Sequence, residues 1–372
     1  MIYLDYNAST PIDPVVIETM EPFIRYQYGN PSTTYKLGKK AKEAVEYSRQ
    51  QIAQLLNCSP EEVIFTSGGS ESNNTVIKGV ANLLKDNGKH IITSQIEHPS
   101  VLNVCHYLEQ IGYSVSYLPV DEYGVIRVED LRESITNETI LVTIMHANNE
   151  TGSIQPIKEI TELCHSKDIV FHTDAAQSAG KIDVDVKKLN VDYLTIAGHK
   201  LYAPKGIGAL YVKKGTPYEP LIHGANHEAG RRAGTENVIF SVALGKACEI
   251  ALYKLQKNDT AILDLTDYFY HQLVEVFGDR IRLNGHPHNR LPNTLNISFI
   301  GYNAHSILEG LGDVAVSTGS ACHSGLMSPS PVLNAMKIDP NVGIGAVRFS
   351  LGRFTTKDEI NTVLDKLKLL IK

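Results

Sequence analysis

The first half of the chain alternates between two patterns, and this alternation limits the possible folds more than any other feature. Short apolar runs rich in β-branched residues predict buried strands at 63–66, 90–94, 115–119, 140–146, 169–173, 193–197 and 209–212. Helical periodicity lies between most of them, at 37–56, 70–85, 100–111 and 157–167. The alternation predicts an α/β fold with a mostly parallel, mixed seven-stranded sheet that is covered on both faces by helices. The short link from 197 to 209 is expected to add a strand without a crossover helix.

A second, smaller unit is predicted in the last third of the chain. A long helical stretch from 238 to about 257 is expected to connect the first unit to the second. The following elements are a helix at 261–276, a strand at 294–298, a Gly/Ser/Pro-rich stretch at 317–331 and an amphipathic helix at 357–372. We therefore predict a large domain of residues 14–255 and a small α+β domain of residues 1–13 and 256–372.

The composition argues against several classes of protein. The formal net charge is -6 over 372 residues, and the basic residues are spread along the chain, so no basic face for nucleic acid is expected. No apolar stretch is long enough to span a membrane, and the first residues lack the pattern of a signal peptide. Five scattered cysteines without a C-x-x-C pair or zinc spacing predict reduced thiols, no metal site and a cytoplasmic location.

Polar clusters follow several predicted strands, at the edge where open α/β sheets bind their ligands. The turn at 67–71 ends a strand and begins a helix with two glycines, which predicts an anion site. An ordinary loop capped by Ser70 would show the same pattern. The spacing is neither that of a Walker loop nor that of a dinucleotide fingerprint.

Three further side chains at this edge have two interpretations each. Lys200 follows a buried strand, where an ammonium is costly and a Schiff base with pyridoxal phosphate would remove the cost; otherwise it is a surface lysine in a turn. Asp174 is either a helix N-cap or the partner of a pyridine nitrogen. His98 is either a satisfied polar residue or a ring that stacks on the cofactor and moves protons near neutral pH.

Motifs along the whole chain give it a resemblance to a known family. They are YLDYNASTP at 3–11, GNPS at 29–32, SGGSESN at 67–73, EH at 97–98, MHANNETG at 145–152, HTDAAQ at 172–177, GHK at 198–200, GTEN at 234–237, GSAC at 319–322 and RFSLGR at 348–353. On these motifs, the chain resembles the cysteine desulfurases of the NifS/IscS type. These are fold type I pyridoxal-phosphate enzymes of the class V aminotransferase group.

The resemblance implies which residues hold pyridoxal phosphate. Lys200 would form the Schiff base and later move protons, while Asp174 pairs with the ring nitrogen and His98 stacks on the ring. The other implied cofactor contacts are Gly69, Ser70 and His199 on the phosphate, Gln177 on the phenolic oxygen, Asn149, and Thr235 reaching the phosphate of the neighbouring subunit. The functional unit would then be a homodimer.

Cys322 defines the reaction that the resemblance implies. As a thiolate it would take the sulfur of L-cysteine, release L-alanine and keep a persulfide for a sulfur-acceptor protein, in iron–sulfur cluster assembly or another pathway. Arg348 and Asn149 would bind the substrate carboxylate. Cys322 lies in the 317–331 stretch, whose length resembles the long-loop IscS-like branch. A mobile loop there suits a thiol that delivers sulfur elsewhere. The other four cysteines lie in or beside predicted helices, as small apolar residues do.

The sequence also departs from the family pattern. Ala197 stands where a phosphate-binding serine is common, Tyr35 replaces a histidine, the run 225–232 differs, and His323 follows the nucleophile where serine or threonine is usual. The partial positive charge of His323 would favour the Cys322 thiolate. The departures suggest a side branch. Three alternatives to a cysteine desulfurase are a selenocysteine lyase, a class V transaminase and a scaffold protein without catalysis. Cys322 argues against a transaminase, because transamination needs no thiol nucleophile.

Overall fold

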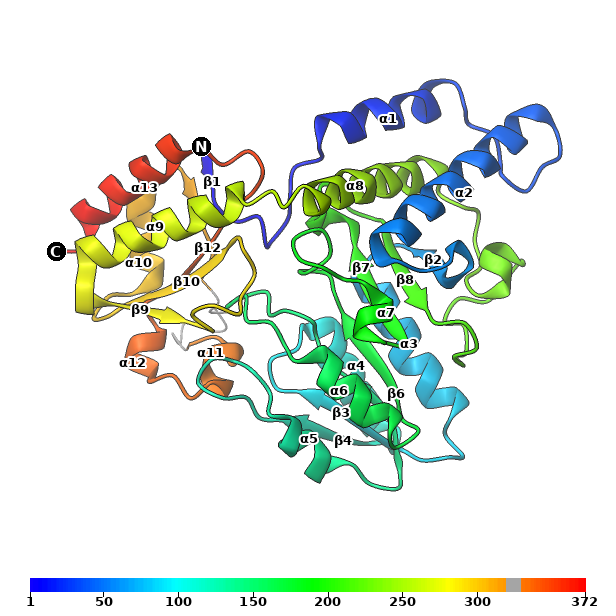
Figure 1. Cartoon of the computed structure of the whole chain (residues 1–372), viewed down its shortest axis with the longest axis horizontal. Coiled ribbons are helices and arrows are strands. Elements are labelled where there is room, and N and C mark those ends of the chain that lie inside the picture. The colour runs from blue at the N-terminus through cyan, green and yellow to red at the C-terminus, as the bar shows by residue number, and fades with distance from the viewer. Residues whose placement is uncertain (319–328) are drawn as a thin grey trace.

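The computed structural model describes residues 1–318 and 329–372. Its largest feature is a seven-stranded sheet with the strand order β2-β8-β7-β6-β5-β3-β4 (Figure 1). The strands are β2 (Val63–Thr66), β3 (His90–Ser94), β4 (Ser114–Leu118), β5 (Thr139–Thr143), β6 (Val170–Asp174), β7 (Tyr193–Ala197) and β8 (Gly208–Val212). All pairs from β4 to β7 are parallel, whereas β8 is antiparallel to both β7 and β2. The predicted α/β class and mixed seven-stranded sheet are confirmed.

Apolar residues on both faces of this sheet explain why its strands are continuous apolar runs. Successive residues point to opposite faces, so Ile92 and Val142 join one core while Ile91 and Leu141 join the other. The helices that contribute buried residues to the first core include α1 (Pro14–Arg25), α2 (Lys36–Leu56), α6 (Ile157–His165) and α8 (Val238–Gln256). The second core lies under α3 (Gly69–Leu83) and α4 (Pro99–Gln110). Helices therefore cover both faces, as parallel strands require.

A smaller unit with its own apolar core follows the sheet (Figure 1). Its antiparallel sheet has the order β12-β10-β9, and a separate short parallel pair joins β1 to β11. The strands are β1 (Ile2–Tyr3), β9 (Ile281–Asn284), β10 (Thr294–Phe299), β11 (Val314–Ala315) and β12 (Ala346–Ser350); the helices around them are α9 (Ala261–Phe277), α10 (Ala304–Leu311) and α13 (Lys357–Leu370). Both chain ends lie in this unit. The exact domain limits stay a prediction.

The remaining α-helices of the described residues are short. They are α5 (Val128–Ser134), α7 (Val186–Leu189), α11 (Pro331–Ala335) and α12 (Pro340–Gly343). Within the described part of the chain, we find no helix with the length and hydropathy that a membrane crossing needs.

A buried ion pair ties the unusual 225–232 run to the sheet. The two terminal nitrogens of the Arg49 guanidinium, Nη1 and Nη2, donate to Glu228 at 2.6 and 2.8 Å, and the two side chains are 9% and 4% exposed. The same carboxylate accepts a hydrogen bond from the backbone N–H of Phe65 on β2, at 3.1 Å. Glu228 therefore neutralises an arginine that would otherwise be buried without a charge partner on this side.

Replacing Glu228 should be costly for this reason. We expect Glu228→Gln to lower the free energy of unfolding by about 3–5 kcal/mol, the usual loss when one partner of a buried pair is removed. Glu46→Gln is the matched control, because Glu46 contacts the same arginine but its side chain is 48% exposed, and it should cost at most about 1 kcal/mol. Urea denaturation measures both, and equal losses would contradict this account.

Candidate active site

One cavity of about 440 Å³ brings together most of the residues that the sequence singled out. It lies at the carboxyl end of the parallel strands, where β6 ends at Asp174 and the turn after β7 reaches Lys200. Nine predicted residues line it: Gly69, Ser70, His98, Asn149, Asp174, Gln177, His199, Lys200 and Arg348. Thr235 does not line it but is exposed in the segment before α8. Cys322 and His323 lie outside the described residues.

The amine of Lys200 is held inside this cavity by two backbone carbonyls. It donates to the oxygen of Asn7 at 2.6 Å and to that of Ala8 at 2.8 Å. Burial first and the charge of Arg348 second lower the pKa of Lys200 to about 8, against the opposing charges of Asp5 and Asp174. A lysine with this pKa has a larger neutral fraction at neutral pH than an ordinary lysine, and Schiff-base chemistry requires the neutral amine.

The Asp174 carboxylate is oriented by two donors. One oxygen accepts from the side-chain amide of Asn73 at 2.7 Å, and the other accepts from the backbone N–H of Ala176 at 2.9 Å. Asp174 is 8% exposed and lines the cavity. Fixed in this way, the carboxylate can accept a proton or a hydrogen bond from a group in the cavity.

The hydrogen bonds of His98 decide which ring nitrogen has the proton. Its Nδ1 accepts from the backbone N–H of Ser100 at 3.1 Å and lies 2.8 Å from the Ser100 hydroxyl. In the neutral ring the proton is therefore on Nε2. Burial lowers the pKa of His98, the charge of Asp174 raises it, and that of Lys200 lowers it. The ring is thus mostly neutral at neutral pH, and it presents an N–H donor away from Ser100.

The first turn of α3 provides donors for an anion. Helix N-termini leave backbone N–H groups unpaired, and Gly69 and Ser70 begin this 15-residue helix at the cavity wall. Gly68 precedes them at φ 149°, a conformation that favours glycine. Burial is the main cause that lowers the pKa of His199 to about 4, and the charges of Lys200 and Lys205 act in the same direction. A neutral His199 would thus bind an anion by hydrogen bonding. Ala197 also lines the cavity, so the common serine hydroxyl is missing there.

Arg348 links the two units of the chain at this cavity. It lies on β12 and donates to the backbone oxygen of Asn149 at 2.9 Å and to the Asp5 carboxylate at 2.7 Å. Its Nε atom is buried and has no partner among the described residues. Glu150 is close by, and burial raises its pKa to about 7 against the opposing effects of Ser330 and Arg348. A spare buried donor of this kind fits a carboxylate ligand.

The residues that sequence reasoning missed are mainly those that orient the others. Asn7 is 1% exposed, and its carbonyl oxygen accepts from both Lys200 and Gln177. Asn73 orients Asp174, and Lys181 donates to Gln177 at 3.0 Å. Both asparagines stand inside motifs that the resemblance used, but no local pattern distinguishes them from loop or helix residues.

Comparisons with known proteins agree with this geometry. The family model described as "Aminotransferase class-V" matches residues 2–363. The chain belongs to the class V aminotransferase family. It is 47% identical to "Cysteine desulfurase IscS" of Dictyoglomus turgidum and 44% identical to the protein of that name from Methanosarcina thermophila, covering all of this chain and 94% and 92% of those proteins.

Solved structures of this family share the fold over nearly the whole chain. A structure titled "NIFS-LIKE PROTEIN" superposes with a TM-score of 0.92 at 37% identity, covering 99% of this chain and 98% of that one. One titled "SspA in complex with cysteine" gives 0.85 at 37% identity, covering 96% and 100%. The predicted fold type I architecture and the assignment to the cysteine desulfurases of this family are confirmed.

The pKa of Lys200 can be measured directly in cofactor-free protein. We expect the pH dependence of its acylation, followed by peptide mass spectrometry, to have a midpoint near 8, well below the usual value for a lysine. Arg348→Met should raise the Lys200 midpoint, because it removes a nearby positive charge. A Lys200 midpoint at the usual lysine value, or one that falls in Arg348→Met, would contradict the description of the cavity.

Proposed function

We propose that this chain uses pyridoxal phosphate to remove the sulfur of L-cysteine, releasing L-alanine and leaving a persulfide on Cys322. The observation that carries the proposal is the single cavity that contains the Lys200 amine, the Asp174 carboxylate and the buried Arg348 guanidinium. The relatives named cysteine desulfurase support the reaction, and the structure titled in complex with cysteine supports the substrate class.

The residues of the cavity fit pyridoxal phosphate at three points. The free N–H groups of the first turn of α3 and neutral His199 would bind the phosphate. The two hydrogen bonds to Asp174 would hold its carboxylate toward the ring nitrogen, and His98 would lie against the ring. When bound, the cofactor supplies an electron-withdrawing ring that stabilises negative charge on the substrate α-carbon.

The substrate would be oriented by its carboxylate. Arg348 is fixed by Asp5 and by the Asn149 carbonyl, and its unpaired Nε remains available for that carboxylate. Asn149 would assist with its side chain. Lys200 would then hold and move a proton at the α-carbon, because its amine gains and loses a proton near neutral pH.

In the sulfur step, the sulfur of cysteine is transferred from carbon to the sulfur of Cys322. The Cys322 thiolate forms an S–S bond with the sulfur of cysteine while the C–S bond breaks. The carbon skeleton takes up a proton and leaves as alanine. The persulfide would then pass to an acceptor protein, and iron–sulfur cluster assembly is one pathway that would use it.

Supplying cysteine to the pyridoxal-phosphate-loaded protein tests this function. We expect one alanine for each sulfur released, and an added sulfur atom on Cys322 during turnover. Cys322→Ala should lose more than about 99% of the activity, because no other thiol replaces the nucleophile. Cys58→Ala is the control and should keep it, since burial raises the pKa of that thiol to about 12.

Three outcomes would contradict the proposal. Alanine without sulfur on Cys322 would rule out the persulfide, and pyruvate or a transamination product would indicate another class V reaction. Turnover of selenocysteine but not cysteine, retained in Cys322→Ala, would identify a selenocysteine lyase.

We also propose a homodimer in which Thr235 binds the phosphate held by the neighbouring subunit. Sedimentation should give twice the chain mass of 41.0 kDa. Thr235→Ala should weaken pyridoxal-phosphate binding roughly tenfold or more, since a hydrogen bond to a charged group is lost. Thr362→Ala, an exposed threonine on α13, is the control and should leave the affinity unchanged. A monomer, or equal affinity in both variants, would overturn this arrangement.

A further inference from the structure

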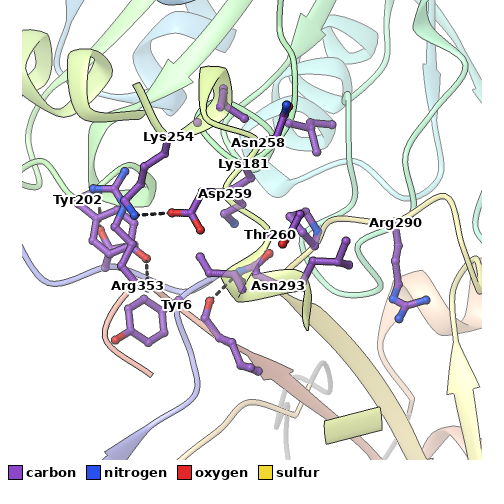
Figure 2. Close-up of a pocket in the computed structure, with 18 of the residues that line it drawn as sticks. Tyr6, Lys181, Tyr202, Lys254, Asn258, Asp259, Thr260, Arg290, Asn293 and Arg353 are labelled. Carbon is purple, nitrogen blue, oxygen red and sulfur yellow. Dashed lines mark hydrogen bonds and ion pairs between the residues drawn. The ribbon is translucent and has the colours of Figure 1, made fainter. Parts of the chain in front are cut away.

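A second cavity, of about 410 Å³, lies against the wall of the active-site cavity. Its lining includes Tyr6, Lys181, Lys254 and Asn293, which are labelled in Figure 2. Lys181 connects the two cavities. Its stem lines the second one, while its amine donates to Asn7 and Gln177, which both line the first.

The partners of Lys181 are unusual for a buried amine. Its Nζ donates to the Asn7 side-chain oxygen at 2.9 Å and to the Gln177 side-chain oxygen at 3.0 Å. Within residues 1–318 and 329–372, no carboxylate forms an ion pair with it. Burial and the charges of Lys200 and Arg348 lower its pKa well below the usual value. A neutral amine still donates, so both hydrogen bonds persist in either protonation state.

The first consequence concerns the orientation of the Gln177 amide. The two ends of this amide are nearly the same in shape, so its neighbours decide which end points where. The Lys181 amine donates to the side-chain oxygen of Gln177, and the side-chain nitrogen of Gln177 donates to the Asn7 carbonyl at 3.0 Å. The second N–H of that nitrogen stays available for the active-site cavity.

The second consequence concerns Asn7. Its side-chain oxygen accepts from Lys181 and from Asn293, the latter at 3.1 Å. Its side-chain nitrogen donates to Thr294 at 2.9 Å, and its carbonyl accepts from Lys200 and Gln177. Lys181 therefore helps to fix the residue whose backbone holds the Lys200 amine.

We propose that Lys181 is a positioning residue that fixes Gln177 with its N–H group, and not its oxygen, toward the ring oxygen of the cofactor. This inference rests on the proposed function, because it assigns the bound ring to the active-site cavity. Lys181 acts through Gln177 and Asn7 and does not itself need to touch the cofactor.

The pH midpoint of the visible absorption band of the bound cofactor tests this proposal. A donor on the ring oxygen favours the deprotonated form, so Lys181→Met should raise the midpoint by about one pH unit, a tenfold change worth about 1.4 kcal/mol. Lys254→Met is the matched control. It removes the same group from the same cavity, but Lys254 pairs with Asp259 and contacts neither Gln177 nor Asn7 in the described residues. Its midpoint should equal that of the wild type.

A double-mutant cycle then tests whether Lys181 acts on the bound cofactor through Gln177. In a Gln177→Ala background the donor is already gone, so Lys181→Met should no longer move the midpoint. Should Lys181→Met not fold, Lys181→Ala serves instead, since truncation only enlarges an existing cavity, and the same rise is expected.

The outcomes are distinguishable. An unmoved midpoint in both Lys181 variants, or an equal shift with and without Gln177, would overturn the positioning role while leaving the proposed function intact. A wild-type protein that binds pyridoxal phosphate without any visible band would overturn the proposed function, and this inference with it.

Discussion

The position of Asn7 is the constraint on which the rest of the site depends. Its carbonyl oxygen accepts from Lys200 and Gln177, which come from the large sheet unit. Its side chain is hydrogen-bonded to Asn293 and Thr294 of the smaller unit. The N-terminal segment thus lies between the two units and supports the reactive amine from one side. A displacement of this segment would change the environment of the amine without altering any catalytic side chain.

Burial sets the chemistry of the cavity more than any single charge pair. It is the largest cause of the lowered pKa of Lys200, His98 and His199, and of the raised pKa of Glu150. Burial disfavours the charged form of each group, so amine, imidazole and carboxyl all move toward neutrality. At neutral pH the His98 and His199 rings are therefore mostly uncharged, and Lys200 is the basic group that gains and loses a proton closest to neutral pH. Arg348 forms an ion pair with Asp5, which offsets the cost of burying its guanidinium.

The large sheet was predictable because its strands are buried on both faces and are separated by amphipathic helices. The run 193–197 matches β7 to the residue, and the short link to β8 does add a strand without a crossover helix. The strand β12 was not predicted from periodicity, and Arg348 was found only through the family resemblance. Its partner Asp5 lies 343 residues away in the sequence. No local pattern encodes such a contact, because it depends on how two units pack.

The same limit applies to the residues that orient the site. In the sequence, nothing distinguishes Lys181 from any other lysine that follows a glycine. Only the fold places its amine against Gln177. Ala197, by contrast, was identified as a departure by comparing motifs, and it does line the cavity. Residue type and spacing therefore predict the groups that react, whereas the groups that orient them depend on contacts between distant segments.

Borohydride reduction of the purified protein, followed by peptide mapping, tests the central claim most directly. The account predicts that the visible absorption band disappears and that the reduced cofactor is found covalently attached to Lys200. Attachment to a different lysine, or no attached cofactor in protein reconstituted with pyridoxal phosphate, would contradict it.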